Sequence, residues 1–299
     1  IKRLMENFQY ILPEIFISVS IMLFLLVGVF KKNSASLIYN LSNISLVILL
    51  ALIINLSSLD TIYLFNDSYL IDNLSNYMKI ILVGSGIFVM LTGSKYIQVI
   101  NLNKIEYPIL ILSSILGMMI MISSNDLIVF YMGLELQSLA LYVLASFNRD
   151  NLLSTESGLK YFVLSALSSG LLLYGCSLTY GFSESTNFDQ ILINSTEFNY
   201  GTTFGIVFIL VGLAFKISAV PFHMWAPDVY QGSPTSVTLF FAILPKIAAL
   251  SVFIKFLYTP FANMNDQWQT IIVFISIASM IFGAVAAIGQ KNLKRLIAY

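Results

Sequence analysis

Nine stretches of mostly apolar residues constrain this chain more than any other feature. They fall near residues 10–30, 37–57, 79–100, 107–125, 126–147, 159–181, 202–223, 234–257 and 269–289. About 20 apolar residues suffice for one helix to cross the hydrocarbon core of a bilayer. Only helices and closed barrels satisfy all their backbone polar groups in lipid. The pattern predicts an all-α, polytopic membrane helix bundle with nine spans and, from Leu296 on, the start of a tenth.

Composition narrows the range of functions. The chain is 58% hydrophobic and 10% charged, whereas soluble domains carry about a quarter charged residues. A net charge of zero gives no sign of a nucleic-acid partner. One cysteine, Cys176, and one histidine, His223, leave no disulfide framework, cysteine-ligated iron–sulfur cluster or clustered metal ligands. We therefore expect no cofactor and no metal to be bound by this chain.

Loop charges predict an orientation. Basic residues follow spans one, three, five and nine, and acidic residues occupy the opposite loops. By the positive-inside rule, the basic side faces the cytoplasm, or the matrix in a mitochondrion. Two basic residues at the N-terminus, Lys2 and Arg3, fall on the opposite side and do not fit this orientation. The basic set is Lys31, Lys32, Lys104, Arg149, Lys291, Lys294 and Arg295, and the acidic set is Asp60, Asp67, Asp72, Glu184, Asp189, Glu197 and Asp266.

One stretch departs from the pattern of plain spans. Residues 215–234 read FKISAVPFHMWAPDVYQGSP and place Lys216 inside an apolar run, close to His223. Pro221 removes a backbone donor and clashes one turn back, so the helix should break near it. Freed backbone groups are tolerated at membrane depth only where protein or water satisfies them. An ionisable residue beside a broken helix indicates an ion pathway.

Three charged residues fall near the middle of the membrane. At about 1.5 Å per helical residue, Glu135 lies about 14 Å and Lys216 about 20 Å from one face, and Lys246 about 18 Å from the other. A charge at the bilayer centre costs at least a few kcal/mol. Pro245 directly precedes Lys246, so we expect a second broken or kinked helix there.

These charges are interpreted as a proton relay. Burial disfavours the charged form of a lysine, whereas a nearby carboxylate favours it. Glu135 is the expected partner of Lys216, and Lys246 is a second station. The alternative is a static Glu–Lys pair that locks helices together, which leaves Lys246 without a partner.

Four further residues have weaker assignments. His223 fits a relay or a structural role, since histidine titrates near neutrality. Lys160, at the start of span six, can snorkel to the interface, and a functional role for it stays open. Glu14 can simply favour a helix N-terminus. Asp126 is placed to cap the fifth span.

Four segments carry a resemblance to a known family. They are FKISAVPFHMWAPDVYQGSPT, LELQSLALYVLA, STESGLKYFVLSALSSGLLLYG and QKNLKRLIAY. Together they resemble the subunit N family of proton-pumping NADH:quinone oxidoreductase (respiratory complex I), called NADH dehydrogenase subunit 2 in mitochondria. Sister subunits L and M and related antiporter subunits share the Lys…Pro…His…Trp-x-Pro-Asp frame, and the DVYQGSPT continuation is similar to subunit N in particular.

The resemblance implies an architecture. The family has fourteen helices with two inverted five-helix repeats, each containing a broken helix. Residues 1–106 would form an N-terminal three-helix segment, 107–257 the first repeat, and 258–299 an incomplete second repeat. The family's charged residue of the twelfth helix has no counterpart before Tyr299. We therefore expect a C-terminally incomplete chain, either truncated or completed by a second polypeptide.

The resemblance also implies a function. The family's half-channel residues map onto Glu135, Lys216 and Lys246. The chain would be a proton-translocating subunit without a redox centre, coupled to quinone reduction elsewhere in the complex. NADH, FMN, iron–sulfur clusters and quinone would be used in other subunits. The partners would be the lipid bilayer, antiporter-like subunits M and L, and subunit K, in a bacterial inner or mitochondrial inner membrane. An Mrp-like cation/proton antiporter subunit and a structural scaffold with static lysine pairs are the alternatives.

Overall fold

The computed structural model describes residues 9–31, 34–57, 61–194 and 199–299. Within them, nine helices are long and apolar enough to cross a membrane, which confirms the predicted spans. Five charged residues used in the orientation argument lie outside the described residues: Lys2, Arg3, Lys32, Asp60 and Glu197.

The elements are α2 (Leu12–Phe30), α3 (Ala35–Leu56), β1 (Ile62–Leu64), β2 (Tyr69–Ile71), α4 (Asn73–Val99), α5 (Glu106–Ser123), α6 (Leu127–Ala145), α7 (Leu152–Ser183), α8 (Phe188–Asn194), α9 (Tyr200–Ile217), α10 (Ala226–Gly232), α11 (Thr235–Tyr258), the 3₁₀ helix η1 (Ala262–Met264), α12 (Asn265–Ile288) and α13 (Leu293–Ala298).

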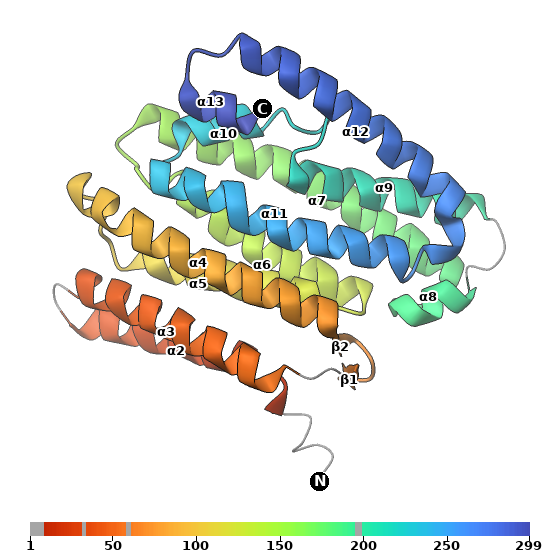
Figure 1. The fold of residues 1–299 in the computed structure, drawn as a ribbon, viewed down its shortest axis with the longest axis horizontal. Helices are drawn as coiled ribbons and strands as arrows, with labels where there is room; N and C mark the ends of the chain where they lie inside the picture. Colours follow the sequence, from red (N-terminus) through yellow and green to blue (C-terminus); the bar gives the residue numbers. More distant parts are fainter. Residues whose placement is uncertain (1–8, 32–33, 58–60, 195–198) are drawn as a thin grey trace.

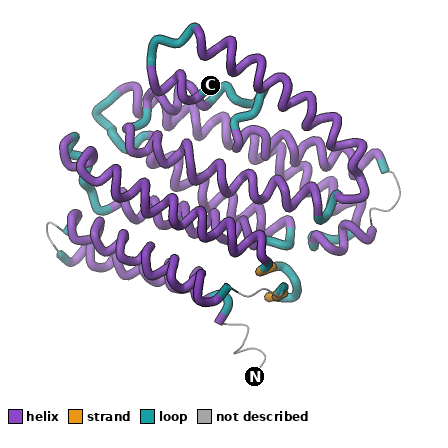
Figure 2. Tube along the Cα trace, viewed as in Figure 1, coloured by secondary structure: helices purple, strands orange, loops and turns teal. Residues whose placement is uncertain are grey.

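The long helices run in alternating directions side by side (Figure 1). The pair α2 and α3 forms one edge, α12 forms the opposite edge, and α11 lies between α4 and α9. The β1–β2 hairpin and α8 lie at one end of the bundle, and the α4–α5 and α6–α7 connections lie at the other. Figure 2 shows the β1–β2 hairpin, which contains the two strands found among the described residues. The acidic and basic loop residues that the structure describes thus lie at opposite ends.

Helix starts are fixed by side-chain caps. The Asp126 carboxylate accepts hydrogen bonds from the backbone of Ile128 at 2.7 Å and of Val129, which confirms its predicted role. Asp72 and Ser75 form a reciprocal capping box at the start of α4. Such caps satisfy backbone donors that the first turn leaves free. The cap at Asp72 also explains why α4 begins several residues before the apolar window near 79–100.

Two helix pairs pack with their backbones in contact. A Cβ added at Gly117 of α5 would lie 2.8 Å from the carbonyl oxygen of Gly133 in α6. A Cβ at Gly175 of α7 would lie 2.8 Å from the carbonyl oxygen of Gly205 in α9. Small residues at such interfaces let membrane helices approach closely. These contacts fix α6, α7 and α9, which carry the charged site.

The helix break near Pro221 is confirmed, and it begins earlier than the predicted span suggested. Helix α9 ends at Ile217, and α10 begins at Ala226 after a turn. Ser218 closes α9 in the left-handed conformation, with φ 62°, and the Val220–Pro221 peptide is cis. The expected span 202–223 is therefore a shorter helix followed by turns that lead into α10.

Of the two outcomes expected at Pro245, a broken or a kinked helix, the break is absent, because α11 runs without interruption through this residue. Proline cannot donate to the carbonyl four residues earlier, which here is that of Phe241. The Tyr230 hydroxyl of α10 donates to this carbonyl oxygen at 3.2 Å. A tertiary hydrogen bond thus satisfies the group that the proline leaves free.

Candidate functional site

Lys216 lies at the meeting point of three helices. It is 4% exposed, and its Nζ donates to the hydroxyls of Ser138 on α6 at 2.7 Å and Ser165 on α7 at 2.8 Å. The Tyr142 hydroxyl also donates to Ser165, at 2.7 Å. A hydroxyl can accept from an ammonium and donate to a neutral amine. The same neighbours can therefore satisfy Lys216 in both protonation states.

Glu135 acts on Lys216 at longer range than the sequence predicted. It lies on α6 one turn before Ser138 and is half-buried. Its charge interacts electrostatically with Lys216, but no ion pair joins the two among the described residues. In this part of the chain its buried Oε1 has no hydrogen-bond partner. The expected direct pair is replaced by two hydroxyls, since Lys216 reaches α6 at Ser138.

Lys246 joins the site through the helix break. Its Nζ donates to the backbone carbonyl of Lys216 at 3.3 Å and to the Ser218 hydroxyl. The last carbonyls of a helix lack hydrogen-bond partners within the helix. A cation at this end also interacts favourably with the helix dipole. The ammonium lies 5.3 Å from the centre of the Trp225 ring, within range of a cation–π interaction. The ending of α9 thus places Lys246 against Lys216.

Trp225 holds the loop that follows the break. Its Nε1 donates to the carbonyl of Phe215 at 2.9 Å. Its ring stacks on Tyr161 of α7, with the ring centres 4.5 Å apart. A buried tryptophan of this kind combines a large apolar contact with one satisfied polar group. The aromatic stack therefore fixes the surroundings of Lys246.

His223 lies in the same loop but faces another element. Its ring packs edge-on against Phe282 of α12, with centres 4.6 Å apart, and lies 6.0 Å from the ring of Tyr299. In the described structure no hydrogen bond joins it to Lys216 or Lys246. The structure thus leaves His223 outside the lysine pair.

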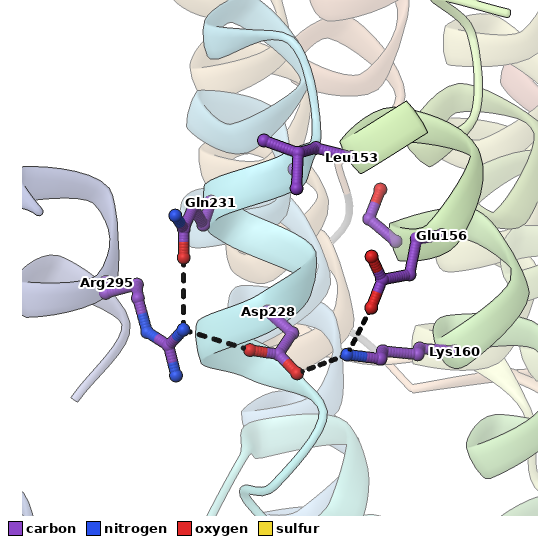
Figure 3. Close-up of a pocket in the computed structure, with 8 residues that line it drawn as sticks. Leu153, Glu156, Lys160, Asp228, Gln231 and Arg295 are labelled. Atoms are coloured by element: carbon purple, nitrogen blue, oxygen red, sulfur yellow. Dashed lines mark hydrogen bonds and ion pairs between the residues drawn. The ribbon is translucent and has the colours of Figure 1, made fainter. Parts of the chain in front are cut away.

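A polar cavity of about 240 Å³ opens among α7, α10 and α13 (Figure 3). Lys160 forms ion pairs of 2.7 Å with both Glu156 and Asp228, and Asp228 pairs with Arg295 at 3.3 Å. The Lys160 side chain is 40% exposed. It reaches the interface as expected, and there it also joins an ion-pair network. The next residue, Tyr161, belongs to the aromatic stack on Trp225. The cavity therefore adjoins the site from the basic end.

The sequence prediction overlooked two buried lysines, Lys79 and Lys255. Lys79 is 3% exposed and pairs with Glu14 at 2.6 Å, so the role expected of Glu14 at a helix N-terminus is incomplete. Lys255 is 4% exposed. Both lie near the ends of apolar windows, where a lysine normally snorkels outward. Sequence position alone gave no signal of their burial.

No group of three or more His, Cys, Asp or Glu residues able to hold a metal ion occurs within the described ranges. The site consists instead of lysines held by hydroxyls, a backbone carbonyl and an aromatic ring. Buried lysines beside an interrupted helix, in a bundle of helices long and apolar enough to cross a membrane, define the class: a polytopic membrane protein with ionisable residues inside its helix bundle.

Comparison with known proteins identifies the family. The chain belongs to the transmembrane family described as "NADH:quinone oxidoreductase/Mrp antiporter, TM", whose model matches residues 124–299. The NADH-quinone oxidoreductase subunit N of Pelagibacter ubique is 70% identical over 297 residues, which are 99% of this chain and 63% of that protein. The subunit N of Rhodospirillum rubrum is 51% identical over 96% of this chain and 60% of its own length. The chain thus spans about three fifths of these relatives.

Solved structures agree on the fold. A chain of respiratory complex I from Thermus thermophilus with bound aureothin matches with a TM-score of 0.81 and 28% identity, over 96% of this chain and 61% of that one. A chain of the Mrp complex from Dietzia matches with a TM-score of 0.84 and 18% identity, over 98% of this chain and 56% of that one. At the second identity the likeness concerns the fold alone. The expected antiporter-like helix bundle is confirmed.

Proposed function

We propose that this chain forms part of the proton-translocating membrane subunit N of an NADH:quinone oxidoreductase. The observation that carries the proposal is the hydroxyl environment of Lys216, which suits both protonation states, directly beside Lys246. The 70% identity to a subunit N supports the complex I assignment over an Mrp-like antiporter. The Mrp structure shares the fold at 18% identity.

In the proposed mechanism, Glu135 and Lys246 both influence the proton affinity of Lys216. The negative charge of Glu135 acts on the Lys216 side chain, whereas the Lys246 ammonium contacts the Lys216 carbonyl at the end of α9. A change in either charge would cause Lys216 to bind or release a proton. Ser138 and Ser165 would keep the side chain in place in both states. His223 is retained as a weaker candidate for the relay.

The proposal assigns the remaining parts of the reaction to other chains. NADH, FMN, iron–sulfur clusters and quinone would be handled by other subunits, and this chain would couple to them through conformational change. We propose the antiporter-like M and L subunits and subunit K as partners, in a bacterial inner membrane, since the relatives described above are bacterial. The division into 1–106, 107–257 and 258–299 stays a proposal.

The test compares two variants of Lys216 in the full-length subunit within the assembled complex. Lys216→Met removes the charge, whereas Lys216→Arg keeps it but does not titrate. Both should lower proton pumping about tenfold or more relative to quinone reduction. The measurement is NADH-driven acidification of proteoliposomes beside the NADH:quinone reductase rate, with assembly checked on native gels.

Lys95→Met serves as the matched control, because Lys95 is an exposed lysine of α4. It should leave pumping unchanged. A Lys216→Arg complex that pumps at the unaltered proton-to-electron ratio would contradict the proposed relay.

A further inference from the structure

A second group of buried ionisable residues lies toward the end of the bundle that carries the β1–β2 hairpin. Its members are Glu14 on α2, Tyr69 on β2, Lys79 on α4 and Lys255 on α11, and each is at most 7% exposed. They come from four different elements and lie apart from the Lys216–Lys246 pair. Buried ionisable residues in a membrane protein call for a functional explanation.

Three of these residues form a closed hydrogen-bonded triad. The Glu14 Oε1 atom accepts from Lys79 Nζ at 2.6 Å and from the Tyr69 hydroxyl at 2.8 Å. Lys79 also donates to the Tyr69 oxygen, at 3.0 Å. Glu14 and Tyr69 line a cavity of about 460 Å³ bordered by α2, α5 and α6. The triad pairs one ammonium with one carboxylate, so its charges balance.

Lys255 lacks such a direct partner. Its Nζ has one hydrogen bond in the described structure, a long 3.4 Å contact to the Ile122 carbonyl. The charges that face it are Asp72 at the start of α4 and Asp189 on α8, which attract it, and Lys79, which repels it. No ion pair joins it to either aspartate within the described ranges. Its ammonium is therefore much less well satisfied than that of Lys79.

The partner of each lysine singles out Lys255. Lys79 is paired with Glu14 at 2.6 Å, whereas the aspartates that face Lys255, Asp72 and Asp189, act on it without an ion pair among the described residues. An ammonium buried without a direct counter-charge is costly, so of these two lysines Lys255 is the one suited to give up a proton.

We propose that Lys255 is a second proton-exchanging residue, which binds and releases protons at the end of the bundle bearing the acidic loops. On release, one N–H bond of the ammonium breaks, its electron pair stays on Nζ, and a water or a loop carboxylate takes the proton. Rebinding reverses the step. This inference rests on the proposed function as a proton-translocating subunit.

Lys255 is separate from the relay at the helix break. It lies nine residues after Lys246 on α11, which corresponds to about 13 Å along the axis and a half turn around it. Lys246 reaches α9 through the Lys216 carbonyl, whereas Lys255 reaches α5 through Ile122. The two lysines thus serve opposite faces of one helix.

The experiment measures Lys255→Arg and Lys255→Met in the full-length subunit within the assembled complex in proteoliposomes. Arginine retains the charge without titrating. We expect both variants to lose proton pumping per NADH oxidised while quinone reduction and assembly persist. A Lys255→Arg complex with the full proton-to-electron ratio would show a static role and overturn the inference.

Two additions keep the result decisive. If the Lys255 variants fail to assemble, Asp189→Asn removes a facing negative charge, and the pH profile of pumping should shift toward lower pH; an unshifted profile overturns the inference. Lys216→Arg, measured in parallel, separates the two proposals. If Lys216→Arg loses pumping and Lys255→Arg pumps normally, only the proton-exchanging role of Lys255 is rejected. If both variants pump normally, the proposed function is rejected.

Discussion

Lys216 and Lys79 are equally buried lysines held in opposite ways. Lys79 contacts a carboxylate at 2.6 Å, whereas Lys216 contacts two serine hydroxyls at 2.7 and 2.8 Å. An ionised carboxylate only accepts hydrogen bonds and favours the ammonium form, but a hydroxyl can accept or donate. The two lysines therefore differ in the chemical type of their partners and not in their burial.

The largest expected effect comes from breaking the Glu14–Lys79 pair. Glu14→Ala leaves the Lys79 ammonium buried without its counter-charge, which should cost about 3–5 kcal/mol of stability. The thermal melting point of the purified subunit complex in detergent measures the loss. The double variant Glu14→Ala/Lys79→Met should recover much of it. A double variant no more stable than the single one would show that the pair is not the source of the effect.

A smaller effect is expected where hydroxyls hold a lysine. Ser138→Ala and Ser165→Ala each remove a hydrogen bond to the charged Lys216, worth about 1.5–3 kcal/mol. Proton pumping should fall in each variant and further in the double variant, with the complex still assembled. Ser276→Ala, an exposed serine of α12 bonded to its own helix, is the control. Unaltered pumping in the double variant would remove the basis for the hydroxyl-held relay.

Weaker still is the contact between Lys246 and Trp225. Trp225→Leu removes a cation–π interaction of about 0.5–2 kcal/mol together with the hydrogen bond to Phe215. Trp225→Phe keeps an aromatic face and loses the hydrogen bond. Pumping measured across pH should be closer to normal in the phenylalanine variant. Equal defects in both would assign the role of Trp225 to its hydrogen bond.

The smallest effect is expected at the cavity of Figure 3. The Lys160–Asp228 pair is partly exposed, with its side chains 40% and 34% accessible, and such pairs contribute about 0–1 kcal/mol. Lys160→Met and Asp228→Asn should therefore change the melting temperature only slightly, and the change should be smaller still at high salt. A double-mutant cycle measures the coupling. A strong pumping defect with normal stability would instead include the cavity in the proton route.

Local physics explains which expectations held. Proline geometry acts within one turn, so the break beside Pro221 followed from the sequence. Pro245 did not break α11, because the Tyr230 hydroxyl supplies the lost hydrogen bond. That rescue depends on α10 packing against α11, which no local pattern records. The capping hydrogen bonds of Asp126, by contrast, come from Ile128 and Val129, two and three residues further on.

The charged site shows the same division. Depth along each helix singled out Glu135, Lys216 and Lys246 from the sequence. The structure brings the two lysines together, yet leaves Glu135 at longer range. Side-chain partners depend on how helices rotate about their axes, and a register estimate does not determine that rotation.

The sequence by itself determined the helical membrane fold, its spans, the presence of a break near Pro221 and the charges at mid-depth, because hydrophobicity and proline act over one helix. Only the tertiary structure decided what each lysine contacts. Lys79 meets Glu14 across 65 residues of chain, and Lys216 meets Ser138 across 78. Contacts between such distant segments arise from the packing of whole helices, and that packing decides whether a buried lysine meets a carboxylate or a hydroxyl.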